Sequence, residues 1–365
     1  MKEMDVKRMA RSEVYKVVPY EAPFVDLKER RRIVKLDLNE NLLLPNRLMR
    51  GLLLRACQDV DLRFYPSPYG ALAADAISDF LGFNRSCIFV GNGGDDVLGS
   101  IARTFIGKGS KVVIVEPTFS VYANLTRTYG GRELPVHLQS DFSLDVDAVI
   151  RRCGRGAVLL FICSPNNPTG NQFDSEDLEK IIRSFDGIVI LDEAYGEFSE
   201  YSTVGWTRDF DNLIVLKTFS KAFGMAGIRL GYFVSNRSIV TCVKRAAPPF
   251  NVNAVAEQLV KFALENWKYL KRYAERVIKE RGWLLSGLAG IEGVTPYPSE
   301  TNFILFKIAH HRLLSSTAAE ALEKRGVLVK DFGSNPLLKN CIRVTVGPRS
   351  MNERFLEVLR EVMEE

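Results

Sequence analysis

Four short apolar runs, separated by amphipathic segments, constrain the fold of this chain more than any other feature. Each run is almost continuously apolar and ends at turn or polar residues, which is typical of a parallel strand buried on both faces. One intervening segment, residues 175–185, has helical periodicity, with Asp174 or Ser175 as its expected N-cap. The alternation predicts an α/β doubly wound, mostly parallel sheet. The runs are SKVVIVEP (110–117), AVLLFICSP (157–165), GIVILDEAY (187–195) and NLIVLKTFS (212–220).

The pattern changes near residue 250, where Pro248 and Pro249 interrupt the chain. A long charged amphipathic helix is expected over about 253–288, and shorter segments then alternate between strand and helix patterns. We expect 1–45 to form an N-terminal arm and part of a small domain, 46–250 a large domain and 251–365 a small α+β domain. The later segments are strands at 301–308, 326–332 and 340–347 and helices at 314–325 and 351–364.

Composition excludes several classes of function. The net charge is only +5 over 365 residues, and the basic residues are scattered among acids, so we expect no nucleic-acid partner. The basic run KERRRIVK (28–35) is expected to be a solvated helix face rather than a phosphate patch. No apolar stretch reaches the roughly 18 residues that span a membrane.

Cysteine and histidine usage narrows the chemistry further. The six cysteines are widely spaced and form no CxxC pair, so we expect free thiols and no metal site. With only three histidines, histidine acid–base catalysis is not expected. The first residues lack the apolar core of a signal peptide, and we therefore expect a reducing, cytoplasmic location.

Polar residues follow three of the predicted strands directly. Asn167, Asp192 and Lys221 each come at or just after a strand end, and ligands of open parallel sheets bind outside those ends. In a pocket with other cations, Lys221 would have a lowered pKa and could form a Schiff base; the alternative is a solvated loop lysine. Asp192 could hold a proton on a pyridine nitrogen, or it could cap a helix.

Two turns complete the pattern. The segment SPNNPTG (164–170) contains two prolines and ends at Gly170, so its rigidity would hold the amide of Asn167 against a ligand. The segment GNGGDDVLGSIARTF (91–105) places glycines before a helix, where free backbone N–H groups can bind phosphate. A plain tight turn is the alternative, and Asp95 could instead cap that helix.

Eight segments together make the chain resemble the class I/II aminotransferases, which are pyridoxal-phosphate (PLP) enzymes of fold type I, and most closely the histidinol-phosphate aminotransferase family. The resemblance runs from about Leu38 to the C-terminus, in family order. It implies a homodimer with shared sites. The segments are LNEN (38–41), YPSPYG (65–70), GNGGDDVL (91–98), EPTFSVY (116–122), SPNNPTG, DEAYGEF (192–198), FSKAFGMAGIRLGY (219–232) and IRVTVG (342–347).

The resemblance also implies roles for single residues toward PLP. Lys221 resembles the Schiff-base lysine that also moves the substrate proton, and Asp192 resembles the partner of the ring nitrogen. Tyr195 and Asn167 resemble donors to the ring oxygen, and Phe119 resembles the aromatic residue that stacks on the ring. Tyr65 resembles a tyrosine that reaches the cofactor phosphate of the neighbouring subunit. The residues that resemble the phosphate cradle are Gly94, Asp95, Thr218, Ser220 and Arg229.

Substrate contacts are implied at four positions. Arg343 resembles the clamp for a carboxylate, a bidentate task suited to a guanidinium, and Asn39 resembles its neighbour. Lys330 stands where histidinol-phosphate enzymes often have Arg. Tyr20 could pack on a substrate ring or fix the N-terminal arm as a hydrophobic staple. The segment NENLLLP (39–45) departs from the family's usual NENPYGP, which puts the substrate rather than the chemistry in doubt.

These features predict a PLP-dependent aminotransferase that transfers an amine from histidinol phosphate to 2-oxoglutarate in histidine biosynthesis. Two alternatives in the same family stay open, an aromatic amino-acid aminotransferase and a threonine-phosphate decarboxylase. A non-catalytic PLP-binding protein is the alternative from another class. The intact set of Lys221, Asp192 and Arg229 argues against it.

Overall fold

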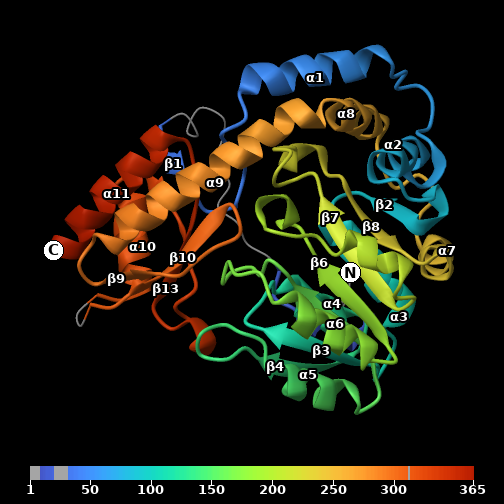
Figure 1. Cartoon of the computed structure of the whole chain (residues 1–365), viewed down its shortest axis with the longest axis horizontal. Coiled ribbons are helices and arrows are strands. Elements are labelled where there is room, and N and C mark those ends of the chain that lie inside the picture. Colours follow the sequence, from blue (N-terminus) through green and yellow to red (C-terminus); the bar gives the residue numbers. More distant parts are fainter. Residues whose placement is uncertain (1–8, 20–31, 311–312) are drawn as a thin grey trace, which may run out of the picture.

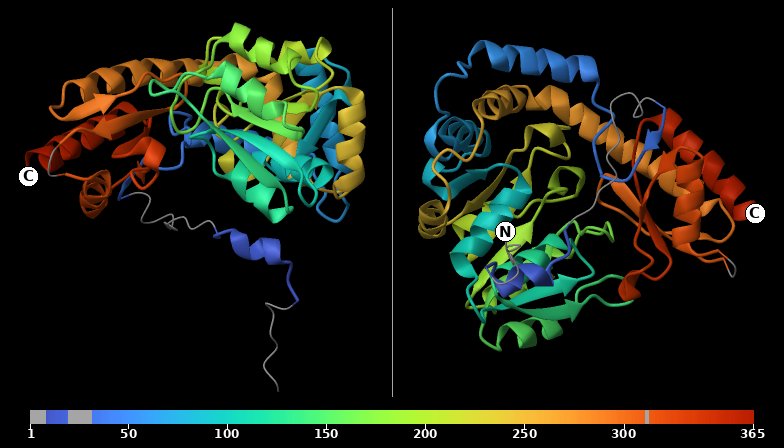
Figure 2. Two further views of the ribbon diagram at one scale, coloured as in Figure 1. Left: turned by 90° about the horizontal axis from the view of Figure 1, so that it is seen from below. Right: turned by 180° about the vertical axis from the view of Figure 1, so that it is seen from behind.

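The computed structural model describes residues 9–19, 32–310 and 313–365. It contains two parts, each built on its own sheet, with the long helix α9 (Trp267–Ala289) extending from one to the other (Figures 1 and 2). Tyr20 and residues 28–31 lie outside the described residues. Within the described ranges, none of the helices combines the length and the apolar character needed to cross a bilayer.

A seven-stranded sheet forms the larger part. Five neighbouring strands run parallel to one another, in the order β7, β6, β5, β3, β4. Strand β8 pairs antiparallel with both β7 and β2. The prediction of an α/β, mostly parallel sheet is therefore confirmed. The strands in sheet order are β2 (Ile88–Gly91), β8 (Gly231–Ser235), β7 (Leu213–Thr218), β6 (Ile188–Asp192), β5 (Ala157–Cys163), β3 (Lys111–Glu116) and β4 (Arg132–His137).

Helices cover both faces of this sheet, which explains why its central strands are almost continuously apolar (Figure 2). In β3, Val113 and Val115 enter one core cluster, and Val112 and Ile114 enter the other. Helices α3 (Gly94–Phe105), α4 (Val121–Thr128) and α7 (Arg237–Ala246) contribute to the second cluster. The first cluster is covered by α1 (Asn46–Gln58), α2 (Ala71–Leu81), α5 (Val146–Cys153), α6 (Ser175–Arg183) and α8 (Ala254–Glu265).

An antiparallel four-stranded sheet forms the smaller part, in the order β12 (Lys330–Asp331), β13 (Cys341–Thr345), β10 (Phe303–Ile308), β9 (Val294–Pro296). Helices α9, α10 (Ser315–Lys324) and α11 (Arg349–Glu364) pack around it. The N-terminal strand β1 (Val34–Lys35) pairs in parallel with β11 (Val327–Leu328), so an early segment of the chain lies against this part.

Two local expectations were wrong. The helix expected over 253–288 is two helices, because Asn266 leaves the helical conformation (φ −103°, ψ 13°) between α8 and α9. Helix α8 packs against α1 and α2 beside the larger sheet, so the domain boundary near residue 250 stays a prediction. The described end of the basic run is a strand rather than a solvated helix face: Lys35 is buried and forms ion pairs with Asp37 and Glu40.

Candidate active site

Three strand ends of the larger sheet meet the smaller part at the candidate site. Asp192 is the last residue of β6, and Asn167 and Lys221 follow β5 and β7 by a few residues. Asn167 accepts a hydrogen bond of 2.6 Å from the Arg343 guanidinium, which belongs to β13 of the smaller sheet. The Lys221 amine lies 5.7 Å from the centre of the Tyr195 ring. The site therefore combines residues far apart in the sequence.

Asp192 is a buried carboxylate held by two donors. The Tyr122 hydroxyl donates to its Oδ2 atom at 2.6 Å, and the backbone N–H of Ala194 donates to Oδ1 at 3.0 Å. Burial raises the pKa of Asp192 to about 6, and these two hydrogen bonds oppose that rise. The alternative that Asp192 caps a helix is wrong, because the short helix that follows, Gly196–Phe198, has Tyr195 at its N-cap.

Lys221 is the amine of the site. Its Nζ atom donates to the carbonyl oxygen of Leu38 at 3.0 Å and lies partly buried, so the alternative of a solvated loop lysine is wrong. Burial is the main cause that lowers its pKa to about 8, and the positive charges of Arg343 and Arg229 add to that effect. A larger fraction of the amine is therefore neutral at pH 7 than in an exposed lysine.

Asn39 connects the smaller sheet to Tyr195. Its side-chain amide donates to the Tyr195 hydroxyl at 2.9 Å, and its backbone N–H donates to the Thr345 hydroxyl at 3.0 Å. Its carbonyl oxygen accepts from the side chain of Asn302 at 2.9 Å. These bonds hold Asn39 in a left-handed conformation (φ 57°) that most residues avoid. Burial is the main cause that raises the pKa of Tyr195, so its hydroxyl stays protonated.

Arg343 is fixed from several directions. One guanidinium nitrogen donates to Asn167 Oδ1, and another donates to the carbonyl oxygen of Asp37 at 2.7 Å. The guanidinium also lies 5.2 Å from the ring centre of Phe303 and 5.3 Å from that of Phe332. A planar cation held in this way can receive a carboxylate with little further loss of side-chain freedom.

The first turn of α3 and Arg229 approach each other closely. Gly93 has φ 93°, and a Cβ atom there would lie 2.5 Å from Arg229 Nη2, so only glycine fits. Asp95 pairs with Arg229 at 3.1 Å instead of capping the helix; Asp96 accepts the nearby N–H of Asn92. The alternative that Asp95 caps α3 is therefore wrong, because Gly93 occupies the cap without a side-chain bond.

The donor set at these strand ends fits a phosphate beside an aromatic ring. Backbone N–H groups at the start of α3, including that of Gly94, and the Arg229 guanidinium favour an anion. Thr218 ends β7 and Ser220 directly precedes Lys221, and their hydroxyl oxygens lie 3.1 Å apart. Asp192 supplies the opposite charge that a protonated ring nitrogen needs. The residues that resemble a PLP site are thus compatible with that group.

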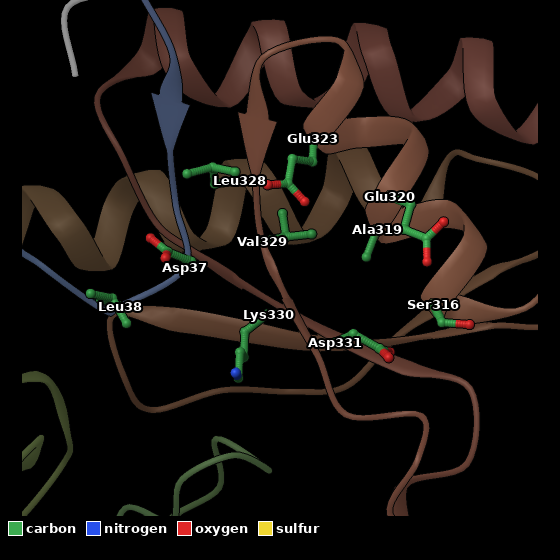
Figure 3. A pocket seen from close by; sticks show the side chains of 10 residues that line it. All are labelled: Asp37, Leu38, Ser316, Ala319, Glu320, Glu323, Leu328, Val329, Lys330 and Asp331. Atoms are coloured by element: carbon green, nitrogen blue, oxygen red, sulfur yellow. The ribbon is translucent and has the colours of Figure 1, made fainter. Parts of the chain in front are cut away.

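Other predicted residues lie further out. Tyr65 is 82% exposed and stacks on Phe250 with ring centres 4.7 Å apart, so within one chain it contributes nothing to the site. Phe119 contacts Tyr122 edge to face at 5.8 Å. Lys330 lies opposite Arg343 in the register of β12 and β13 and lines a cavity together with Asp37 (Figure 3).

Sequence reasoning missed Tyr122, which hydrogen-bonds to Asp192. The residue belongs to the segment EPTFSVY, whose only assigned member was Phe119, three residues earlier. Phe119 lies just before helix α4 and Tyr122 lies in its first turn, and their rings contact each other edge to face at 5.8 Å. The three-residue spacing from Phe119 was the signal in the sequence that could have indicated Tyr122.

Comparison with known proteins decides the family. Residues 31–359 match the family model described as Aminotransferase class I and II. The chain belongs to this family. It is 34% identical to a histidinol-phosphate aminotransferase of Clostridium kluyveri, over 98% of this chain and 99% of that protein. A second such enzyme, from Thermoanaerobacter pseudethanolicus, is 35% identical over 90% of this chain and 93% of its own length.

The fold of this aminotransferase has solved counterparts. The crystal structure of histidinol-phosphate aminotransferase from Sinorhizobium meliloti, in complex with pyridoxal-5'-phosphate, matches with a TM-score of 0.87. The alignment covers 97% of each chain at 24% sequence identity. The expectation of a fold-type I PLP transferase is confirmed.

Proposed function

We propose that this chain is a PLP-dependent aminotransferase that moves an amine from histidinol phosphate to 2-oxoglutarate, as a homodimer in the cytoplasm and as a step of histidine biosynthesis. The observation that carries the proposal is the Lys221 amine, which lies beside Tyr195 with its pKa lowered to about 8 while the neighbouring strand ends at Asp192. The curated relatives named above support the choice of substrate.

When bound, PLP would supply an electron sink for the substrate carbon that bears the amine. The Lys221 amine would join the cofactor aldehyde with loss of water and, once displaced by the substrate amine, would take the proton from that carbon and deliver it to the former aldehyde carbon of the cofactor. Asp192 would hold a proton on the ring nitrogen, and Tyr195 and Asn167 would donate to the ring oxygen. Phe119 would pack on the ring face.

The anion-binding residues support two negatively charged substrates. Arg343 would bind a carboxylate of glutamate or 2-oxoglutarate, next to Asn39. Lys330 and Arg343 are directly opposite each other in neighbouring antiparallel strands, so both side chains leave the same face of the sheet. This second cation would meet the phosphate of histidinol phosphate as a point charge.

An apolar surface supports the homodimer. Leu62, Phe64 and Tyr65 are each more than 70% exposed, and Phe250, on which Tyr65 stacks, is 45% exposed. Clustered apolar side chains of this kind mark contact surfaces. A second copy that covers them would place Tyr65 at its neighbour's cofactor phosphate. All six cysteines are unpaired, which supports a reducing compartment.

The test is a single-turnover experiment on the PLP-loaded enzyme. Histidinol phosphate, phenylalanine, tyrosine and threonine phosphate are mixed with the enzyme in parallel, and the loss of the cofactor absorbance is followed together with CO₂ release. We expect histidinol phosphate to react fastest, without CO₂. Faster reaction with phenylalanine or tyrosine would identify an aromatic aminotransferase, and CO₂ from threonine phosphate would identify a decarboxylase. Absorbance that no amine changes would contradict catalysis altogether.

The Lys330→Ala and Lys330→Arg variants test the phosphate contact. We expect Lys330→Ala to raise the KM for histidinol phosphate about tenfold or more, since a charged hydrogen-bonding partner of the phosphate is lost. Lys330→Arg should restore binding, and the KM for 2-oxoglutarate should change little in either variant. Equal changes in the KM values of both substrates would argue against this role for Lys330.

A further inference from the structure

Tyr122 is a fully buried tyrosine whose hydroxyl donates to the carboxylate of Asp192 and also interacts with the thiol of Cys163. Its ring lies nearly parallel to that of Phe161, with centres 4.9 Å apart and an interplanar angle of 7°. The ring also contacts that of Phe119 in a T-shaped arrangement, with centres 5.8 Å apart and an interplanar angle of 86°. This packing fixes the direction of the hydroxyl, because the ring cannot turn without displacing two aromatic neighbours.

The surroundings of Asp192 make this one hydrogen bond important. Burial favours the neutral acid, and the negative charges of Asp95 and Glu193 act in the same direction. The thiol of Cys163, on the neighbouring strand, is buried as well, and its pKa is raised, so it carries no charge. Among the described residues, the donors Tyr122 and Ala194 favour the carboxylate form. A hydrogen bond to a charged oxygen is stronger than one between neutral groups.

Tyr122 itself stays a donor over the whole neutral range. Burial is the main cause that raises its pKa well above the usual tyrosine value, and the charge of Asp192 raises it further. The proton therefore remains on the phenol and points at Asp192 Oδ2. The second oxygen, Oδ1, is held by the backbone N–H of Ala194. The carboxylate is thus fixed in position by two donors from different elements.

We propose that Tyr122 is a positioning residue for Asp192, which keeps that carboxylate charged and aimed so that it can hold the proton of the cofactor ring nitrogen. The inference rests on the proposed function, since it assigns Asp192 to that nitrogen. Through its contact with Phe119, the same tyrosine supports the residue assigned to the ring face. One side chain would therefore align both groups.

The test is the Tyr122→Phe variant, which keeps the ring and removes only the hydroxyl. The enzyme is loaded with PLP labelled with ¹⁵N in its ring, and the ¹⁵N chemical shift reports where the proton lies. We expect the wild type to show a protonated ring nitrogen and Tyr122→Phe to show a shift toward neutral pyridine. We also expect kcat to fall about tenfold or more, with KM nearly unchanged.

A matched control is Tyr201→Phe, which removes a tyrosine hydroxyl that donates to the Phe173 carbonyl away from the site. It should leave the ¹⁵N shift as in the wild type. Site-specific 3-fluorotyrosine at position 122 keeps the fold and makes the phenol a stronger donor, so it should move the ¹⁵N shift in the opposite direction to Tyr122→Phe. This variant also decides the matter if Tyr122→Phe fails to fold.

The failures of the two proposals are distinguishable. If the wild type bonds PLP at Lys221 and both variants at position 122 keep its ¹⁵N shift, the role of Tyr122 is overturned and the proposed function stands. If the wild type forms no bond between Lys221 and PLP, both proposals are overturned together.

Discussion

The lowered pKa of Lys221 has a consequence that can be measured as a rate. At a pKa of about 8, about one amine in ten is neutral at pH 7, against about three in ten thousand at the ordinary value of 10.5. Only the neutral amine attacks an aldehyde. The site should therefore capture the cofactor about 300-fold faster at pH 7 than an exposed lysine of equal nucleophilicity.

The assay mixes cofactor-free protein with PLP at constant ionic strength between pH 6 and pH 10 and follows the absorbance of the bound cofactor. The rate should rise with pH and level off above about pH 8. Burial is the largest cause of the shift and Arg343 the next, so Arg343→Met should move the midpoint to higher pH. Glu40 acts in the opposite direction, and Glu40→Gln should move the midpoint to lower pH.

Two results would refute this reasoning. A midpoint near 10.5 in the wild type would mean that the Lys221 amine is solvated. An unchanged midpoint in both Arg343→Met and Glu40→Gln would mean that neither charge acts on it. Lys221→Ala serves as the control, because it should form no covalent bond with the cofactor at any pH.

Two further perturbations test the surroundings of the amine. In the folded protein the pKa of Asp192 is raised from 3.8 to about 6. Asp192 therefore lowers the free energy of unfolding by an amount that grows as pH rises through that range and is constant above it. In the cofactor-free protein, Asp192→Asn should be more stable than the wild type by up to about 3 kcal/mol at pH 8 and about half that at pH 5. Urea unfolding measures this, and a less stable variant at pH 8 would contradict it. Gly93→Ala should weaken PLP binding because its Cβ atom would displace Arg229. Gly99→Ala, inside the helix that Gly93 precedes, places its Cβ atom in open space and should bind PLP normally. Equilibrium dialysis measures the binding of both variants.

Strands β3, β5, β6 and β7 of the larger sheet could be predicted because they are buried on both faces, so each reads as a continuous apolar run. Three strands escaped prediction. Strands β2 and β8 are buried too, but they are only four and five residues long. Strand β4 lies at the sheet edge, its buried residues alternate with partly exposed ones, and it contains Pro135. The break at Asn266 escaped because the amphipathic pattern continues across it. A local sequence pattern indicates which residues are buried, but it does not show the tertiary contacts at which a helix or strand ends.

The site was predictable where it follows strand ends and unpredictable where it depends on distant contacts. Asp192 and Lys221 come directly after apolar runs, and this position identifies them. The partner of Asp192, Tyr122, lies 70 residues away, and its hydroxyl has no sequence signature. Lys35 looked solvated in a basic run, but folding brings it onto Asp37 and Glu40 in the interior.

The most direct test asks which atom of the protein bonds the cofactor. The enzyme is loaded with PLP, reduced with borohydride to make the bond permanent, digested and mapped by mass spectrometry. The pyridoxyl group is expected on the peptide that contains Lys221, in about one copy per chain, and on no other lysine. A label on another lysine, or no label on an enzyme that still transfers amines, would contradict the assignment.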